Sequence, residues 1–193
     1  EKYPGLQYRE PFLGEPDPLP LEDTATHYLA QKAMDMMEDM AAQGGPWHLR
    51  FDLSEPHLPC RPAAPFSGRV DPASLEPWGS FSEDFRKKPY IQAQQPVSWG
   101  LEAMTWDDWA PVVARYHEAV SQMDDAVGRL LDKLRALGQE EHTVVLFTTD
   151  HGDMGGSHRM LDKHYVLYED VTHVPMILKA PGHTRPGQRL EGF

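Results

Sequence analysis

VVLFTTDHGDMGGSHRMLDK, residues 144–163, joins a run of apolar side chains directly to a dense group of polar ones. The apolar run is continuous and rich in β-branched and aromatic residues, so a strand buried on both faces of a parallel sheet is expected at 143–149. A short helix is expected at 165–170, and a second apolar run, VPMILKAPG, follows it at 174–182. This alternation of strands and helices predicts an α/β fold.

Two longer helices are expected upstream of this stretch. Apolar residues recur at helical spacing in the first of them, which Asp23 or Thr24 can cap and the glycine pair at 44–45 can end. The second begins with a capping-box pattern, T-x-x-D, at Thr105, and its apolar face continues as far as Gly138. Both helices are therefore expected to bury one face against a core.

The remaining upstream segments give weaker patterns. WHLRFDL, residues 47–53, alternates apolar and polar positions and predicts a strand. Residues 1–22 contain many prolines and no periodicity, so an irregular lead-in is expected there. Residues 59–104 are rich in Pro, Ser, Gly and Trp and are expected to form a long loop region on the side of the polar group.

The composition excludes several classes of protein. The formal net charge of −12 over 193 residues argues against a nucleic-acid-binding surface. No apolar stretch is long enough to span a membrane, which indicates a soluble protein but does not indicate its compartment or its oligomeric state. A single cysteine, Cys60, rules out an internal disulfide framework and a cysteine-based zinc site.

Four residues are candidates for chemistry, each with a plainer alternative. Asp150 and His151 come directly after the expected strand, where α/β sheets collect their sites, and they can either bind one divalent cation or belong to an ordinary polar loop. Lys163 can hold an anionic group such as sulfate or phosphate, or it can be a surface lysine. His57, between two prolines after the strand at 47–53, can donate a proton to a leaving group or be structural.

A longer stretch, FTTDHGDMGGSHRMLDKHYVLYEDVTHVPMILKAPG, resembles the C-terminal signature of the sulfatase family in the alkaline phosphatase superfamily. The similarity is to the Asp-His branch, which includes aryl- and choline-sulfatase-like enzymes and phosphonate monoester hydrolases. PLPLEDTATHYLAQKAMDMM, FDLSEPHLP and YHEAVSQMDDAVGRLLDKLRALG resemble other family elements in the family's order. The resemblance implies an alkaline phosphatase-like sandwich with a mainly parallel central sheet flanked by helices, of which residues 1–193 form only the middle and C-terminal part of one catalytic domain.

The resemblance also implies roles for individual residues. Asp150 and His151 would be metal ligands, with Ca²⁺ expected first and Mg²⁺ or Mn²⁺ as alternatives. Lys163 would contact the sulfate or phosphate oxygens, His57 would lie near the leaving-group oxygen, and His158 would contribute to substrate binding. The implied function is metal-dependent hydrolysis of small-molecule sulfate esters. Hydrolysis of phosphonate or phosphate esters, or an inactive fragment or pseudoenzyme, are the alternatives.

The nucleophile of such an enzyme is missing from these residues. Sulfatases attack with a formylglycine made from Cys or Ser in a C-x-P-x-R or S-x-P-x-R motif, and neither motif occurs in residues 1–193. Cys60 lies in CRPAA, where Ala64 replaces the arginine, so a structural thiol is expected. The formylglycine and the first strands are therefore expected upstream, the 193 residues are expected to be a segment of a longer enzyme, and alone they are expected to be inactive.

Overall fold

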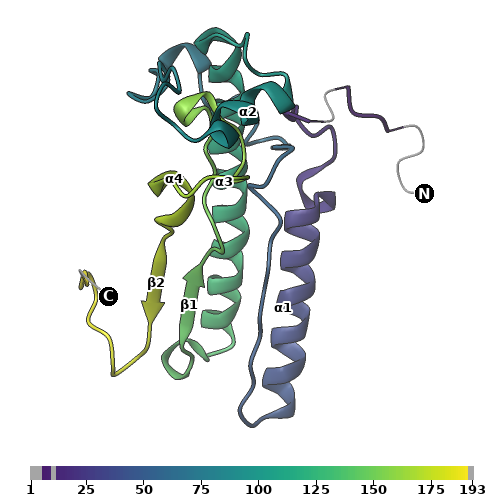
Figure 1. The fold of residues 1–193 in the computed structure, drawn as a ribbon. Coiled ribbons are helices and arrows are strands. Elements are labelled where there is room, and N and C mark those ends of the chain that lie inside the picture. Colours follow the sequence, from purple (N-terminus) through teal and green to yellow (C-terminus); the bar gives the residue numbers. More distant parts are fainter. Residues whose placement is uncertain (1–5, 10–11, 191–193) are drawn as a thin grey trace.

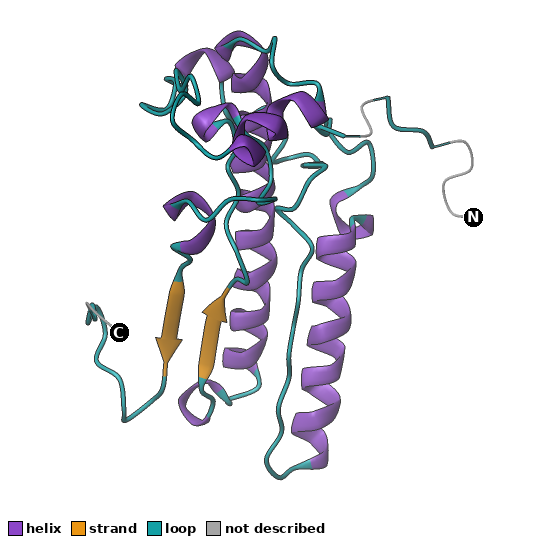
Figure 2. Cartoon of the chain, viewed as in Figure 1, coloured by secondary structure: helices purple, strands orange, loops and turns teal. Residues whose placement is uncertain are grey.

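The computed structural model describes residues 6–9 and 12–190 (Figure 1). Its strands are β1, Val145–Thr148, and β2, Met176–Lys179. Its helices are α1, Ala25–Gln43; α2, Tyr90–Trp99; α3, Trp106–Ala136; and α4, Glu169–Thr172. Short 3₁₀ turns lie at Leu21–Asp23, Pro72–Ser74, Glu140–His142 and Ser157–Arg159. Figure 2 shows the two strands beside the lower half of α3 and most loops gathered around its upper end.

Helix α1 forms where the sequence predicts it. The Thr24 hydroxyl caps the helix by accepting the backbone N–H of His27, and Gly44, with a φ of 70°, ends it. The buried face is made of small and flexible side chains that pack against α3; its residues are Ala30, Ala33, Met34 and Met37. Met36 is 53% exposed, so part of the methionine stripe faces away from this core.

Helix α3 connects the two halves of the structure. Thr105 and Asp108 form the expected capping box at its start, and the chain leaves the helix before Gly138. Its C-terminal half packs on α1 through Ala126, Leu130 and Leu134. Its N-terminal half packs on the loops through the fully buried Trp109 and through Val112, which form a cluster with Leu101 and Leu161. The helix therefore packs on α1 at one end and on the loop region at the other.

Strands β1 and β2 are antiparallel, with Val145 opposite Lys179 and Thr148 opposite Met176. The expectation that β1 is buried on both faces of a parallel sheet is therefore wrong for the described strands. Val145 packs against the α1–α3 cluster, whereas Leu146 on the other face is 57% exposed and its partner Leu178 is 50% exposed. The helices cover one face of β1 only, whereas all four residues of β2 are exposed.

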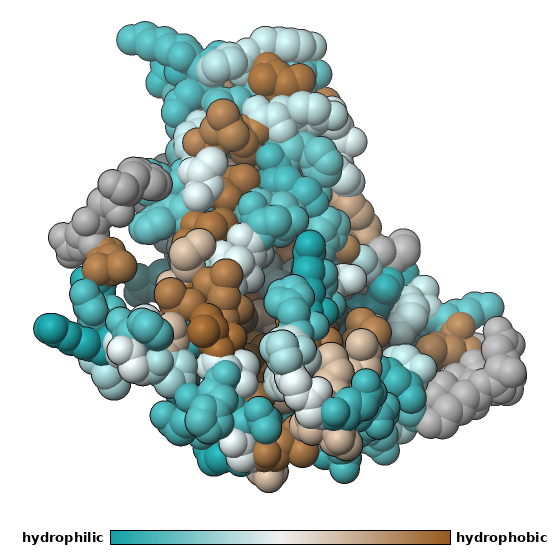
Figure 3. Space-filling model, turned by 90° about the horizontal axis from the view of Figure 1, so that it is seen from below, coloured by the Kyte–Doolittle hydropathy of each residue, from teal (hydrophilic) through white to brown (hydrophobic). Residues whose placement is uncertain are grey.

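Apolar surface is also visible at the lower end of the molecule. Viewed from below, several hydrophobic patches lie among the hydrophilic ones (Figure 3). On the two strands, the neighbouring apolar residues Leu146, Met176, Ile177 and Leu178 are each at least 50% exposed, which differs from the scattered single residues of an ordinary surface. A sheet face of this kind is the part of the fold that a neighbouring layer covers in a complete α/β sandwich.

The predicted strand at 47–53 is extended but unpaired. Trp47, Leu49 and Phe51 pack against the α1–α3 cluster, while His48, Arg50 and Asp52 are exposed. The alternation in the sequence therefore predicts correctly which side chains face the core. No backbone hydrogen bonds join this segment to another described strand, and a strand is defined by that ladder. The prediction of a strand at 47–53 is therefore wrong within the described residues.

The predicted loop region at 59–104 contains more order than its sequence suggests. Helix α2 lies within it, and Gly100, in the left-handed conformation, ends that helix. Pro96 inside α2 hides the helical pattern, because proline is the strongest local signal against a helix. The described part of the lead-in at 1–22 is irregular up to the turn at Leu21–Asp23, apart from one bridge between Asp17 and Ala63.

Among the described residues, no helix has the length and apolarity that crossing a membrane requires.

Candidate active site

The loop that follows β1 turns sharply at Gly152. A β-carbon at this position would lie 1.9 Å from the backbone oxygen of Asp170, so no other residue fits without moving the backbone. The Gly152 N–H donates to the carbonyl of Val171 at 2.8 Å, which ties the loop to α4. Glycine therefore fixes the point at which Asp150 and His151 leave the strand.

Asp150 and His151 lie side by side at this loop. The Asp150 Oδ2 atom is 3.8 Å from His151 Nε2, and the Asp150 side chain is 87% exposed. A hydrogen bond from its own backbone N–H, with a contribution from the adjacent His151, lowers the pKa of the Asp150 carboxyl. His151 Nδ1 donates to the carbonyl of Gly152 at 2.7 Å, which leaves Nε2 as the ring nitrogen that faces Asp150.

This pair fits part of a metal-ligand set. A carboxylate and an unprotonated imidazole nitrogen that face the same space are ligands for divalent cations such as Ca²⁺, Mg²⁺ and Mn²⁺. No group of three or more His, Cys, Asp or Glu side chains in the described part of the chain is arranged to hold a metal ion. A cation bound by Asp150 and His151 would therefore need further ligands other than the His, Cys, Asp and Glu side chains of the described residues.

His57 and Lys163, which are 106 residues apart, meet in the structure. Lys163 Nζ lies 2.6 Å from His57 Nε2. His57 Nδ1 donates to the carbonyl of Leu58 at 2.8 Å, so Nε2 is the acceptor for the lysine. The His57 ring also lies edge-on to the His151 ring, with 6.4 Å between centroids. Three of the predicted site residues, His57, His151 and Lys163, are thus brought together with Asp150 beside them.

His158 lies in another part of the loop. Its ring stacks on Tyr168 at a centroid distance of 4.0 Å, and its Nδ1 is 3.3 Å from a carboxylate oxygen of Glu83. No hydrogen bond, ion pair or ring contact within the described residues joins it to His57, His151 or Lys163. The structure therefore places His158 where the loop attaches to its surroundings, and its role in substrate binding stays a prediction.

Two acidic residues beside the site were missed as candidates in the sequence. Burial raises the pKa of Asp153, and its carboxylate accepts the backbone N–H of Gly155 at 2.8 Å. The side chain of Asp162 is only 7% exposed and forms ion pairs with Lys163 and His164. Their positions inside the D-H-G-D and D-K patterns were the available signal, but their burial could not be read from the sequence.

Part of the long loop region forms an ordered cover over the polar loop. Trp78 Nε1 donates to the carbonyl of Gly155 at 2.9 Å, and the hydroxyls of Ser80 and Ser157 are 2.9 Å apart. The fully buried Gln95 of α2 bonds to both backbone groups of Leu161. These contacts hold the segment that leads into Lys163.

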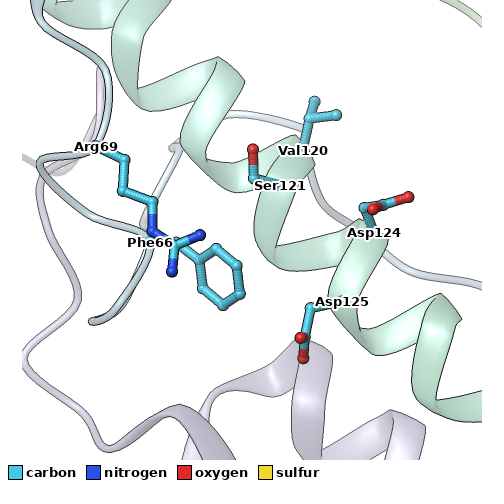
Figure 4. A pocket seen from close by; sticks show the side chains of 6 residues that line it. All are labelled: Phe66, Arg69, Val120, Ser121, Asp124 and Asp125. Atoms are coloured by element: carbon cyan, nitrogen blue, oxygen red, sulfur yellow. The ribbon is translucent and has the colours of Figure 1, made fainter.

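A separate open hollow has a volume of about 400 Å³, and Figure 4 shows the side chains that line it. It lies between α3 and the turn at 66–69, and its lining residues are Phe66, Arg69, Val120, Ser121, Asp124 and Asp125. It shares no residue with the group around Lys163. Asp125 is paired at 2.9 Å with the buried His27 of α1, so this part of the hollow serves to join the two helices.

Cys60 is expected to be unreactive in the folded protein. Its side chain is buried, with the residue 1% exposed, and this burial raises the pKa of the thiol to about 12. The reactive thiolate is therefore almost absent at neutral pH. We expect a thiol reagent to label the native protein very slowly and the protein in guanidinium chloride rapidly. Because Cys60 is the only cysteine, the whole signal reports on it, and fast native labelling would contradict its buried position.

Comparison with known proteins gives a consistent result. The sulfatase family model matches residues 2–193. The chain is 25% identical over 158 residues to the uncharacterized sulfatase YidJ of Escherichia coli (strain K12), covering 82% of this chain and 31% of that protein. It is 28% identical over 171 residues to iduronate 2-sulfatase of Homo sapiens. This match covers 80% of this chain and 30% of that protein. The chain thus spans about a third of the length of these relatives.

The fold is also similar to that of a solved structure. Phosphonate monoester hydrolase SpPMH from Silicibacter pomeroyi superposes with a TM-score of 0.75 at 24% identity, over 95% of this chain and 40% of that one. At this level of identity the likeness concerns the fold. The predicted α/β, alkaline phosphatase-like architecture, present here in part, is thereby confirmed.

Proposed function

Because this chain belongs to the sulfatase family, we propose that it supplies the oxyanion-binding side and part of the metal site of a sulfate ester hydrolase. One observation carries this proposal. Lys163 Nζ and His57 Nε2 meet at 2.6 Å beside His151, at the loop where β1 delivers Asp150. The Lys163 ammonium, an imidazole nitrogen of His57 and two side chains that can bind a metal therefore lie in one place. This combination suits the transfer of an anionic group such as sulfate from one oxygen to another.

Each side chain has a task in this reaction. Lys163 donates to an oxygen of the sulfate, where negative charge increases as the ester bond breaks. His57 Nε2 faces the site and accepts from the Lys163 ammonium at 2.6 Å, so a proton that it gives to the leaving-group oxygen would first have to pass to it from Lys163. Asp150 and His151 Nε2 would hold the divalent cation, which would supply electrostatic stabilisation of the transferring group.

The proposal places the nucleophile outside these 193 residues. Neither C-x-P-x-R nor S-x-P-x-R occurs in the sequence, and the buried Cys60 does not replace them. The proposal therefore includes a formylglycine provided by another segment, with Ca²⁺ as the first candidate for the metal. A sulfate ester of a small molecule is the proposed substrate, and the similarity to a phosphonate monoester hydrolase supports phosphonate esters as the second candidate.

The proposal is tested on the polypeptide isolated from its native source. After removal of metal with a chelator, we expect hydrolysis of an aryl sulfate to return on addition of Ca²⁺, and to exceed hydrolysis of an aryl phosphonate monoester. Faster hydrolysis of the phosphonate would favour the second candidate. No hydrolysis of either ester with Ca²⁺, Mg²⁺ or Mn²⁺ would contradict the proposal.

Replacing the two ligands is expected to weaken metal binding. Asp150→Asn and His151→Ala each remove a donor atom, so calorimetric titration should show Ca²⁺ affinity reduced by at least about tenfold. The matched control is Asp124→Asn, which changes a carboxylate in the hollow of Figure 4 and should leave the affinity unchanged. If Asp150→Asn and His151→Ala bound Ca²⁺ as tightly as the Asp124→Asn control, neither residue would be a ligand of the metal.

A further inference from the structure

Asp162 is a nearly buried carboxylate between two basic side chains. Its Oδ1 atom lies 3.1 Å from Lys163 Nζ and accepts the Lys163 backbone N–H at 2.8 Å. Its Oδ2 atom lies 3.0 Å from His164 Nδ1. A carboxylate with 7% side-chain exposure requires such partners, because an unpaired buried charge is strongly unfavourable.

The backbone around Asp162 is fixed from several directions. Its φ of 62° lies in the left-handed region, which Asp and Asn adopt more readily than other residues with a β-carbon. Its carbonyl accepts the N–H of Met154 at 2.9 Å, and its own N–H bonds to the Asp153 carboxylate. The preceding Leu161 is held by Gln95. The carboxylate therefore points at Lys163 from a rigid base.

This arrangement fixes a side chain that is otherwise very flexible. A lysine ammonium has three donors on a long stem with four carbons. In Lys163, one donor is directed at Asp162 Oδ1 and one at His57 Nε2, so the ammonium is held between them. The third donor is left for an oxygen of the substrate.

We propose that Asp162 is a positioning residue, which holds the Lys163 ammonium against His57 so that its remaining donor meets the oxyanion of the substrate. This inference rests on the proposed function, because it assigns Lys163 to the oxyanion. Asp162 itself does not touch the substrate. It acts by restricting the lysine, and a lysine that is already restricted loses less conformational freedom when it binds an oxygen.

A double-mutant cycle separates positioning from a general structural role. Asp162→Asn keeps an acceptor for the Lys163 N–H and tolerates the left-handed backbone, but it removes the charge that attracts the ammonium. We expect it to lower kcat/KM for a sulfate ester by about tenfold. In a Lys163→Ala background the same change should have less than about a twofold effect, because the group it positions is gone.

Two controls accompany the cycle. In a His164→Ala background, Asp162→Asn should keep its full effect, since the proposed path runs through Lys163. Asp132→Asn removes a carboxylate that is paired with Arg135 at 2.7 Å on the surface of α3, and it should change kcat/KM by less than about twofold. An equal effect of Asp162→Asn with and without Lys163 would overturn the proposal and leave the proposed function standing.

A second measurement does not depend on activity. Asp162→Asn should increase the rate at which an amine-acylating reagent modifies Lys163 several-fold, measured by peptide mass spectrometry against Lys32 as the internal reference. An unchanged rate would overturn the proposal even if the protein hydrolysed no ester at all. Absence of hydrolysis with an increased labelling rate would reject the proposed function and retain the tether between Asp162 and Lys163.

Discussion

Lys163→Ala is expected to lower kcat for sulfate ester hydrolysis by about 10²- to 10³-fold, the usual cost of losing one donor to a developing oxyanion. The structure gives the reason. Lys163 is the cation beside His57, at 2.6 Å from its Nε2, and it is held there by Asp162. Steady-state kinetics with an aryl sulfate, together with thermal unfolding, would measure the effect.

The folded state should tolerate this change. In Lys163→Ala the nearly buried Asp162 carboxylate keeps its ion pair with His164 and the backbone N–H of residue 163, so the variant should stay folded and lose only a few degrees in unfolding temperature. Lys32→Ala on α1, where the lysine is 57% exposed and 3.7 Å from Asp35, is the control and should retain full activity. Unchanged kinetics in Lys163→Ala would remove this residue from the site.

Gly152→Ala is expected to cost more than about 3 kcal/mol of folding free energy, at the upper end of what single substitutions do. The added β-carbon would lie 1.9 Å from the Asp170 backbone oxygen, and a backbone atom cannot move aside as a flexible side chain can. Relief requires the loop to separate from α4, which breaks the hydrogen bond from Gly152 to Val171. Urea unfolding would measure the loss.

Gly128→Ala is the matched control for this prediction. Gly128 lies inside α3, and a β-carbon there would meet nothing within 4 Å. The substitution should therefore stabilise the protein by up to about 1 kcal/mol, because alanine favours the helix. If Gly152→Ala were as stable as Gly128→Ala, the close contact between the loop and α4 would be wrong.

Local sequence patterns identified some residues of the candidate site and not others. The D-H-G-D and D-K patterns indicated Asp150, His151 and Lys163 as candidates, because polar residues after a buried strand are placed at the edge of a sheet. Nothing in the local sequence indicated that Asp162 is buried between Lys163 and His164. Burial depends on α2 and the segment around Trp78, which fold over the loop from far away in the chain.

The strands show the same limit. The apolar runs identified β1 and β2 as strands, since that composition suits a pleated surface. Their antiparallel pairing and the exposure of Leu146 and Leu178 depend on which elements lie next to them. The segment at 47–53 has the alternation of a strand and lacks a described partner, because pairing is a property of two segments and not of one.

The sequence by itself determined the positions and caps of α1 and α3, and it indicated the family of the chain, mainly through one polar loop. These features depend on contacts between residues a few positions apart, such as the capping box of Thr105 and Asp108. Only the tertiary structure decided that Lys163 meets His57 across 106 residues and that Asp162 holds it there. The physical reason is that such contacts form when α3, α2 and the loops pack around a common core, and that packing brings together residues whose own surroundings in the sequence are unrelated.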